Sequence, residues 1–289
     1  MSDEKLTLAD LRSDVDRLDD SLIELLASRA RLVAEIGSIK GADGGPVLRP
    51  GREASLLRRL VAEAGPELDG MTVVRIWREI VSSAVRQQGP FSVAISAPEG
   101  EPSCWALARA HYGAATPMTA HGGASQVIST VAQEKATVGV VPFPGPDEDK
   151  PWWPWIMAEG QPRIVARLPV APGLVPPEGC ASGLALACMA PEPSGSDSSF
   201  IAVETARTLS RTRVANDFKK SGFDVLFSAT GPHDEAAKHD YFLIEVDGFF
   251  NDGASELDAL VENFGDDLFH TTVIGTAALP LALKKGPGS

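Results

Sequence analysis

Six polar residues in the first third of the chain could together form a pocket for an anion. They are Arg12, Arg29, Lys40, Arg52, Glu53 and Gln88. Four cations, one carboxylate and one amide, with no nucleophile and no histidine among them, suit neither hydrolysis nor covalent catalysis. They suit a reaction of a dianion in which the protein orients the substrate and stabilises developing charge. The alternative is that they are solvated charges on helix faces, where most Arg and Lys residues lie.

Arg29 differs from the others because it interrupts an apolar pattern. Residues 6–40 predict one long helix whose apolar residues recur at steps of three and four, as in a heptad seam. The members of this seam are Leu11, Val15, Leu18, Leu22, Leu25, Leu32, Ile36 and Ile39. Arg29 occupies the missing seam position between Leu25 and Leu32. An unpaired charge there would be costly, so a cation at this position indicates an anionic partner.

The length of this helix predicts a dimer. It would be roughly 50 Å long, whereas a 90-residue domain has a radius of gyration of about 12 Å. The seam should therefore be covered by a second copy of the chain. Lys40 lies within about 20° of Arg29 around the helix, but Arg12 lies about 100° away. In an intertwined dimer, Arg12 could serve the pocket of the partner chain.

Two further helices are predicted. The second helix starts near Pro50, and the third runs from about Met71 to Gln88. Breaker clusters bound them at 41–46, 65–66 and 89–90. Gln88 continues the apolar stripe of the third helix after Ile80 and Ala84, so its amide should face inward and need a partner. The alternative is that the helix frays before Gln88.

After Pro90 the pattern changes to short apolar strands and short helices. Strands are predicted at 91–97, 137–143, 163–170 and 184–190, and helices at 104–112 and 124–134, which favours an α/β unit. The last part predicts a strand at 198–204, a helix at 212–221, strands at 223–229 and 241–247, a helix at 254–264 and a strand at 269–275. That order, βαββαβ, is typical of a ferredoxin-like fold.

Composition narrows the function classes. The 289 residues exceed one typical domain, and the net charge of −13 argues against a nucleic-acid partner. Three scattered cysteines predict neither a disulfide framework nor a zinc ribbon. The acidic start lacks a signal core, and no apolar run is long enough to span a bilayer. We expect a cytoplasmic protein that binds no membrane and no metal.

The helical part resembles the all-helical chorismate mutases. The resemblance covers residues 6–88 and is carried by LRSDVDRLDDSLIELLASRARLVAEIGSIKG, PVLRPGREASLLRRL and IWREIVSSAVRQQ. It implies a domain-swapped homodimer of three-helix chains with shared active sites. The implied reaction is the cofactor-free Claisen rearrangement of chorismate to prephenate in phenylalanine and tyrosine biosynthesis.

The resemblance also implies roles for individual residues. Arg29 would bind a carboxylate in its own site, and Arg12 would bind one in the partner's site. Lys40 would contact a carboxylate and the ether oxygen, to which Gln88 would donate. Arg52 and Glu53 would lie over the substrate, with Glu53 holding its hydroxyl. Two secondary substrate-binding positions depart from the family, because Arg49 replaces an acidic residue and Ala84 replaces a serine.

The rest of the chain resembles a damaged prephenate dehydratase. VAISAPEG, TVGVVPF and RIVARLPV are similar to its first lobe, and the βαββαβ tail ending VIGTAALP is similar to its ACT domain. The family's Glu-Asn-Ser is replaced here by Pro144-Gly145-Pro146, and its catalytic Thr-Arg-Phe has no counterpart near Leu184–Met189. The resemblance therefore implies a module without dehydratase activity.

We accordingly predict a multidomain α plus α/β protein. The expected parts are a helical chorismate mutase domain at 1–89, a truncated dehydratase-like α/β lobe at 90–190 and an ACT-like βαββαβ domain at 191–289. Two alternatives stay open. One is a bifunctional mutase and dehydratase, and the other is an inactive mutase that serves as a ligand-sensing or partner-docking protein.

Overall fold

The computed structural model describes residues 7–43, 46–175, 179–232 and 238–283, without the side chains of residues 40–43. The chain forms two compact units. Unit 1 comprises residues 1–47 and 84–90, and unit 2 comprises residues 48–83 and 91–289. The second and third helices therefore belong largely to the unit that contains the sheet.

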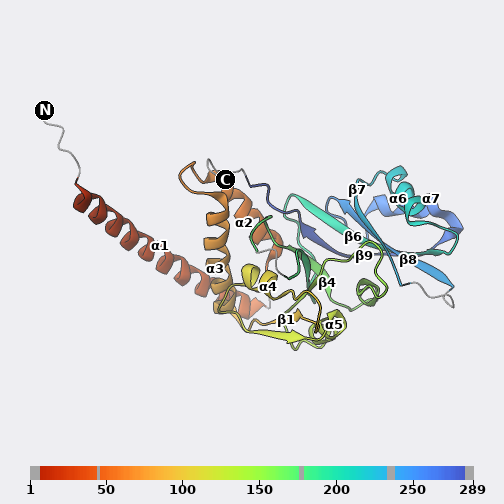
Figure 1. Ribbon diagram of the computed structural model, residues 1–289, viewed down its shortest axis with the longest axis horizontal. Coiled ribbons are helices and arrows are strands. Elements are labelled where there is room, and N and C mark those ends of the chain that lie inside the picture. The colour runs from red at the N-terminus through yellow and green to blue at the C-terminus, as the bar shows by residue number, and fades with distance from the viewer. Residues whose placement is uncertain (1–6, 44–45, 176–178, 233–237, 284–289) are drawn as a thin grey trace. The chain divides into compact units, whose positions relative to one another are not determined.

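Unit 1 is built on α1 (Leu8–Asp43), a helix of 36 residues that confirms the long helix expected from the heptad pattern. Figure 1 shows α1 as one continuous helix. Its eight apolar seam residues are 45–67% exposed in the single chain. An apolar stripe of this extent on one helix needs a covering surface. The last turn of α3 (Gly70–Gln88) completes the unit.

Unit 2 contains α2 (Pro50–Glu63), most of α3 and a nine-stranded sheet with the order β2-β1-β3-β5-β4-β9-β6-β8-β7. The strands are β1 (Val93–Ser96), β2 (Met118–His121), β3 (Val138–Pro142), β4 (Arg163–Leu168), β5 (Gly183–Ala187), β6 (Asp197–Ala206), β7 (Val225–Thr230), β8 (His239–Asp247) and β9 (Leu268–Ala278). The other helices are α4 (Trp105–Tyr112), α5 (Ala124–Ala132), α6 (Arg211–Lys220) and α7 (Ser255–Phe264), with short 3₁₀ turns η1 (Trp153–Ile156) and η2 (Gly265–Asp267).

The helices and strands expected after residue 90 are all present, with ends shifted by a few residues. The sequence did not predict β2, a strand of only four residues, Met-Thr-Ala-His, whose side chains are exposed or half-buried. β2 forms because it pairs in parallel with β1 at one edge of the sheet. The tail has the expected order β6-α6-β7-β8-α7-β9, and its strands pair antiparallel in the order β9-β6-β8-β7.

The sheet continues from the first α/β segment into this tail through β4 and β9. The two strands meet in parallel where Ile164 lies opposite Gly275. A Cβ on residue 275 would lie 2.2 Å from the Ile164 carbonyl oxygen, and the φ of Gly275 is +148°. Only glycine allows the backbones to approach this closely. The proposed boundary near residue 190 thus falls within one continuous sheet.

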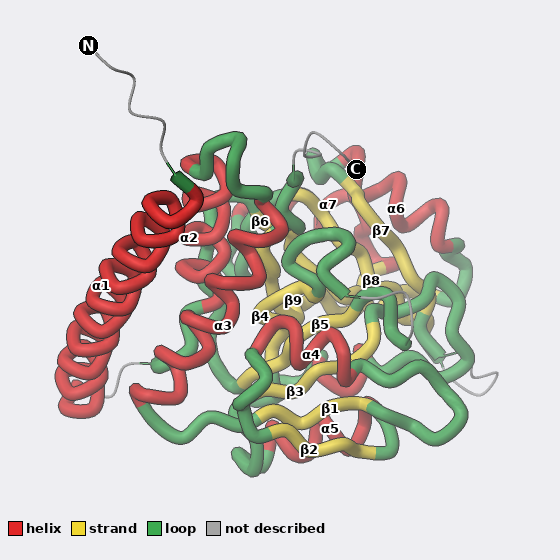
Figure 2. Tube along the Cα trace, turned by 60° about the vertical axis from the view of Figure 1, so that its left-hand side comes forward, coloured by secondary structure: helices red, strands yellow, loops and turns green. Residues whose placement is uncertain are grey.

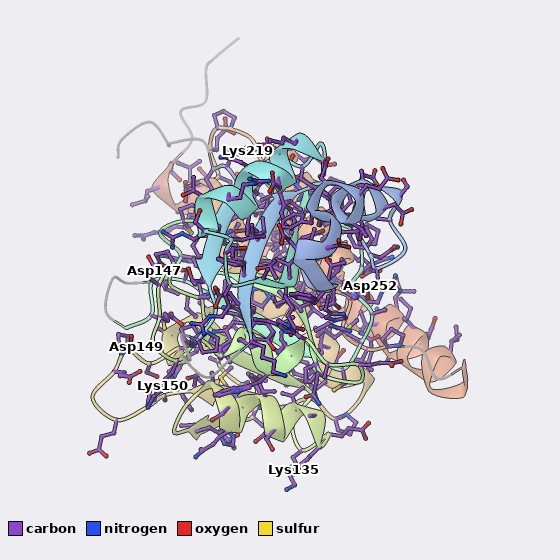
Figure 3. The ribbon with its side chains drawn as sticks, turned by 90° about the vertical axis from the view of Figure 1, so that its right-hand side faces the viewer. Lys135, Asp147, Asp149, Lys150, Lys219 and Asp252 are labelled. Atoms are coloured by element: carbon purple, nitrogen blue, oxygen red, sulfur yellow. The ribbon has the colours of Figure 1, made fainter. Side chains whose placement is uncertain are left out.

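Two apolar layers cover the sheet. Figure 2 shows α4 in front of the strands and α5 behind them. Behind β6, β8 and β9, helices α6 and α7 enclose a cluster around Phe218, Phe242 and Leu260. The opposite face of β6 contacts a second cluster that contains Trp153 and Phe200. Charged side chains project from the outside of unit 2, as Lys135 does beyond α5 (Figure 3).

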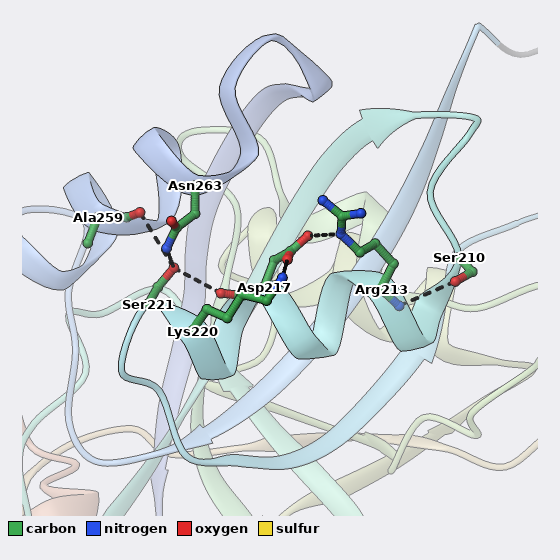
Figure 4. A network of polar contacts seen from close by, with 7 residues as sticks. All are labelled: Ser210, Arg213, Asp217, Lys220, Ser221, Ala259 and Asn263. Carbon is green, nitrogen blue, oxygen red and sulfur yellow. Dashed lines mark hydrogen bonds and ion pairs between the residues drawn. The ribbon is translucent and has the colours of Figure 1, made fainter.

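A buried carboxylate joins the turns of α6. Asp217 is 3% exposed and accepts hydrogen bonds from Arg213 Nε at 2.6 Å and Lys220 Nζ at 2.9 Å (Figure 4). Ser221, four residues after Asp217, donates a hydrogen bond to the Asp217 carbonyl oxygen and accepts one from Asn263 of α7. Burial alone would raise the pKa of the Asp217 carboxyl, but the bonds from Lys220 and Arg213 outweigh it and lower that pKa.

Asp217→Asn should lower the free energy of unfolding by about 1–3 kcal/mol at neutral pH, because two charge-assisted bonds to a buried group are lost. The folded carboxyl has the lower pKa, so its contribution is full above about pH 4 and disappears in more acidic solution. Thermal melts from about pH 3 to pH 7 should therefore show the two proteins converging as the pH falls. Asp149→Asn, which removes an exposed carboxylate, is the control.

Within the described part of the chain, none of the helices combines the length and apolar character required to cross a lipid bilayer.

Candidate active site

Arg29 lies on α1 in unit 1 and is half-buried. Desolvation lowers the pKa of its guanidinium below the ordinary value. Among the residues that the structure describes, no carboxylate pairs with it. A cation that loses hydration without gaining a protein partner is suited to bind an anion from outside the chain.

Gln88 lies in the last turn of α3, against α1. A Cβ on Gly37 would lie 3.1 Å from the Gln88 Cγ and 3.2 Å from its Cα, so glycine lets the two helices meet at this point. Gln88 Nε2 donates to the carbonyl oxygen of the buried Ala84 at 3.1 Å. Its Oε1 is buried, with no partner among the described residues. Rotation of the amide would instead present an NH₂ donor at that place.

Two further predicted residues of unit 1 lie on α1, as Arg29 does. Arg12 is exposed, near the start of the helix. Lys40 lies in the last turns of α1, and its side chain is outside the described part of the structure. Unit 1 therefore carries Arg12, Arg29, Lys40, Ala84 and Gln88, whereas the predicted residues at the start of α2, namely Arg49, Arg52 and Glu53, belong to unit 2.

Arg49 is held by a carboxylate from a distant part of the chain. Its Nε donates to Glu192 Oε1 at 2.7 Å, and its Nη2 also bonds to this oxygen. The hydrogen bond to Glu192 raises the pKa of Arg49. Burial alone would raise the pKa of Glu192, but the bonds from Arg49 outweigh it and lower that pKa. The side chain of Arg52 is exposed, and its backbone N–H donates to Glu192 Oε2 at 3.4 Å.

Glu53 is buried, and its Oε2 accepts a hydrogen bond from Arg78 Nη1 at 2.9 Å. Arg78 is 3% exposed, and its Nε also donates to the His111 carbonyl oxygen at 2.6 Å. This pair ties α2, α3 and α4 together within unit 2. Breaking one partner of such a buried pair leaves an uncompensated charge, which is strongly destabilising.

Beside this pair is a cavity of about 20 Å³, room for about one water molecule. Its lining includes Glu53, Arg78, His111 and Arg167. His111 Nδ1 is buried without a partner among the described residues, and burial lowers the pKa of the imidazole, so it is neutral at pH 7. The cavity is too small for an organic substrate.

Sequence reasoning missed Arg78 and Glu192. Arg78 lies in the third predicted helix, and nothing local shows that a buried carboxylate faces it. Glu192 is 143 positions from Arg49, so the pairing depends on the tertiary fold. Neither residue has a local sequence signal that could have identified it.

The arrangement has a definite chemical character. Unit 1 offers a partly desolvated guanidinium and a buried amide oxygen, neither of which has a partner among the residues that the structure describes. Neither group is a nucleophile or a strong general base at neutral pH. Such groups bind and orient an anion and stabilise negative charge that develops on it.

Comparison with known proteins is consistent with this chemistry for the helical part. Residues 11–89 match the family model for chorismate mutase type II. A bifunctional chorismate mutase/prephenate dehydratase of Pseudomonas aeruginosa is 36% identical over 137 residues, which cover 46% of this chain and 37% of that protein. A T-protein of Enterobacter agglomerans is 43% identical over 81 residues, which cover 26% of this chain and 22% of that protein.

The chain thus spans little more than a third of the length of the Pseudomonas relative that it matches. Among solved structures, a prephenate dehydratase from Streptococcus mutans covers 65% of this chain and 98% of its own, at 14% identity and a TM-score of 0.44. A likeness of this degree carries no functional argument.

Proposed function

We propose, from the match of residues 11–89 to chorismate mutase type II, that this chain catalyses the rearrangement of chorismate to prephenate. The reaction breaks a C–O bond and forms a C–C bond within one dicarboxylate, and it needs no cofactor. The observation that carries the proposal is Arg29, a half-buried guanidinium without a carboxylate partner among the described residues. A substrate carboxylate would supply the missing anion.

Each predicted site residue then has a proposed role. Arg29 and Lys40 bind substrate carboxylate, and Lys40 and Gln88 stabilise the charge that develops on the ether oxygen. The buried Gln88 Oε1 has no partner among the described residues. If the amide rotates, its NH₂ group takes that place and can donate to the ether oxygen. Arg52 and Glu53 cover the substrate, while Arg49 and Ala84 stand at secondary contact positions.

We further propose that the active unit is a homodimer with shared sites. The exposed apolar seam of α1 supports a second copy as its cover, because eight neighbouring apolar residues otherwise remain in water. In this arrangement Arg12 reaches the pocket of the partner chain. A domain swap of α1 would achieve both results.

For residues 90–289 we propose an ACT-like and dehydratase-like module without dehydratase activity. The replacement of the family's Glu-Asn-Ser by Pro144-Gly145-Pro146 supports this part of the proposal. The similarity to the bifunctional protein of Pseudomonas supports the alternative, in which the chain also dehydrates prephenate.

One assay tests both activities. Purified full-length protein is incubated with chorismate, and chorismate, prephenate and phenylpyruvate are separated and quantified without an acid step, because acid converts prephenate to phenylpyruvate. We expect chorismate to be replaced by prephenate alone. Phenylpyruvate formed at an enzymatic rate would establish the bifunctional alternative, and absence of any turnover would favour the binding protein.

A further inference from the structure

Two cysteines far apart in the sequence meet in unit 2. Cys104 Sγ and Cys180 Sγ lie 3.0 Å apart, although 76 positions separate them along the chain. Cys104 is fully buried and Cys180 is 9% exposed, whereas Cys188 is exposed. The three cysteines are scattered along the sequence and are free thiols, but the fold brings the loops of this pair together.

The backbone holds the pair before any covalent bond forms. Cys180 N donates to the Ser103 carbonyl oxygen at 3.2 Å, and Cys104 N donates to the Ser96 carbonyl oxygen at 2.9 Å. Gly179, with φ +91°, allows this approach, since a Cβ there would lie 2.9 Å from the Ser103 oxygen. A disulfide has an S–S distance of about 2.05 Å, so the two sulfurs need to move together by only about 1 Å.

The two thiols are chemically unequal. The hydrogen bond between them lowers the pKa of Cys180 and raises that of Cys104. Cys180 is thus the better thiolate and the more exposed of the two.

We infer that Cys104 and Cys180 form a redox modification site, which closes to an intramolecular disulfide when it meets a small-molecule disulfide such as oxidised glutathione. The Cys180 thiolate attacks one sulfur of the oxidant, and one glutathione thiol leaves. Cys104 then attacks the mixed disulfide, loses its proton to water and expels the second glutathione thiol. The protein loses two hydrogens, and the oxidant is reduced to two thiols.

The bond would join two connections at one end of the sheet. Cys104 follows β1 and stands at the N-cap position of α4, and Cys180 precedes β5, whose first residue pairs with the last residue of β3. The carboxyl ends of β1 and β3 lie there, the edge at which open α/β sheets bind ligands. Oxidation would therefore restrict these connections and raise the melting temperature.

The test treats native full-length protein with oxidised glutathione and then digests it for mass spectrometry. We expect a peptide pair linked through Cys104 and Cys180, its loss on reduction with dithiothreitol, and a higher melting temperature of the oxidised form. Cys188→Ser should form the link unchanged, whereas Cys180→Ser should not form it. Recovery of Cys104 and Cys180 as free thiols from native wild-type protein, while Cys188 carries glutathione, would overturn the inference.

A separate set of contacts concerns the start of α2. Residues Glu192–Ser196, which we call the α2 strap, bond to its first turns. Besides the Glu192 contacts, Ser55 Oγ and Arg58 Nη1 donate to the Ser194 carbonyl oxygen at 2.7 and 2.9 Å. Asp197, which is 5% exposed, fixes the strap by accepting from the Ser194 and Gly195 backbone at 2.9 and 3.0 Å.

Glu192 fills the place of a helix cap in α2. The N-cap residue, Arg49, makes no side-chain capping bond. The Glu192 carboxylate instead accepts from the Arg52 N–H, in the first turn, and neutralises Arg49. A Cβ on Gly51 would lie 2.6 Å from the Glu192 carbonyl oxygen, so the strap packs directly on the backbone of this turn.

We propose, independently of the cysteine pair, that Glu192 is a positioning residue for the mutase reaction. This inference rests on the proposed function, because the turn that Glu192 holds carries Arg52 and Glu53. Without the Glu192 carboxylate, Arg49 is unpaired, and the first turn of α2 loses its cap. The two proposed substrate contacts then lose their fixed place.

Glu192→Gln should lower kcat/KM for chorismate about tenfold in protein that remains folded at the assay temperature. Glu192→Asp should retain more of the rate, because it keeps the charge. Glu63→Gln is the matched control, since it removes an Arg59 partner at the other end of α2. It should change kcat/KM less than about twofold.

The outcomes separate the two proposals. Wild-type protein without mutase activity would contradict the proposed function. Active wild-type protein, with a Glu192→Gln variant that melts at a lower temperature yet keeps both kcat and KM, would contradict the positioning role alone. The second result is the one expected if the Glu192 contacts stabilise the fold without positioning Arg52 and Glu53.

Discussion

Arg29→Ala should reduce kcat/KM for chorismate by roughly three orders of magnitude, while α1 remains helical. The guanidinium is half-buried and lacks a carboxylate partner among the described residues, so its removal costs the protein no ion pair. The substrate, in contrast, would lose a charge-assisted contact to one carboxylate. Steady-state kinetics, together with circular dichroism to verify helix content, measures the effect.

Arg31→Ala is the matched control for this change. Arg31 lies two positions further along α1, is exposed and bonds to Ser28 Oγ at 2.8 Å. Its loss removes the same side chain from the same helix but leaves the proposed pocket intact, so kcat/KM should stay near the wild-type value. Folded Arg29→Ala protein with near-normal activity would show that the pocket is elsewhere.

Arg12→Ala and Arg29→Ala proteins, each nearly inactive alone, should regain activity when they are unfolded together and refolded as a mixture. In a mixed dimer with shared sites, one pocket carries both lesions and the other carries neither. Random pairing makes about half of the dimers mixed, so the mixture should reach about a quarter of the wild-type activity. Chorismate turnover before and after co-refolding provides the measurement.

The proportion of mixed dimers must be known for this result to count. Native mass spectrometry of one tagged and one untagged variant gives that proportion, and each variant refolded alone gives the baseline. If mixed dimers form and activity stays at the baseline, Arg12 acts within its own chain or not at all. Restored activity would support both the dimer and the crossing of Arg12.

The exposed seam of α1 links these two predictions. A helix of 36 residues with eight apolar residues that are 45–67% exposed is not a stable surface for a chain on its own. Polar substitution of one seam residue, such as Leu22, should therefore affect assembly as well as activity. The seam and Arg29 lie on one face of the helix. The surface that the second copy would cover is therefore also the surface that carries the proposed substrate pocket.

Local signals in the sequence determined most of the secondary structure. The heptad steps of residues 6–40, the breaker clusters that bound α2 and α3 and the order β6-α6-β7-β8-α7-β9 depend on periodicity within a few residues. β2 was missed because a strand of four exposed or half-buried residues at a sheet edge is too short for such a signal, and only its pairing with β1 defines it. The match of residues 11–89 likewise rests on a contiguous stretch.

The tertiary structure alone decided how the side chains pair. Glu53 with Arg78, Arg49 with Glu192 and Cys104 with Cys180 join positions 25, 143 and 76 residues apart. It also decided that α2 belongs to the unit with the sheet. The physical reason is that helix and strand periodicity reflect interactions between near neighbours. A buried ion pair or a pair of thiols instead requires the whole chain to bring distant segments within a few ångströms, and no local pattern encodes that approach.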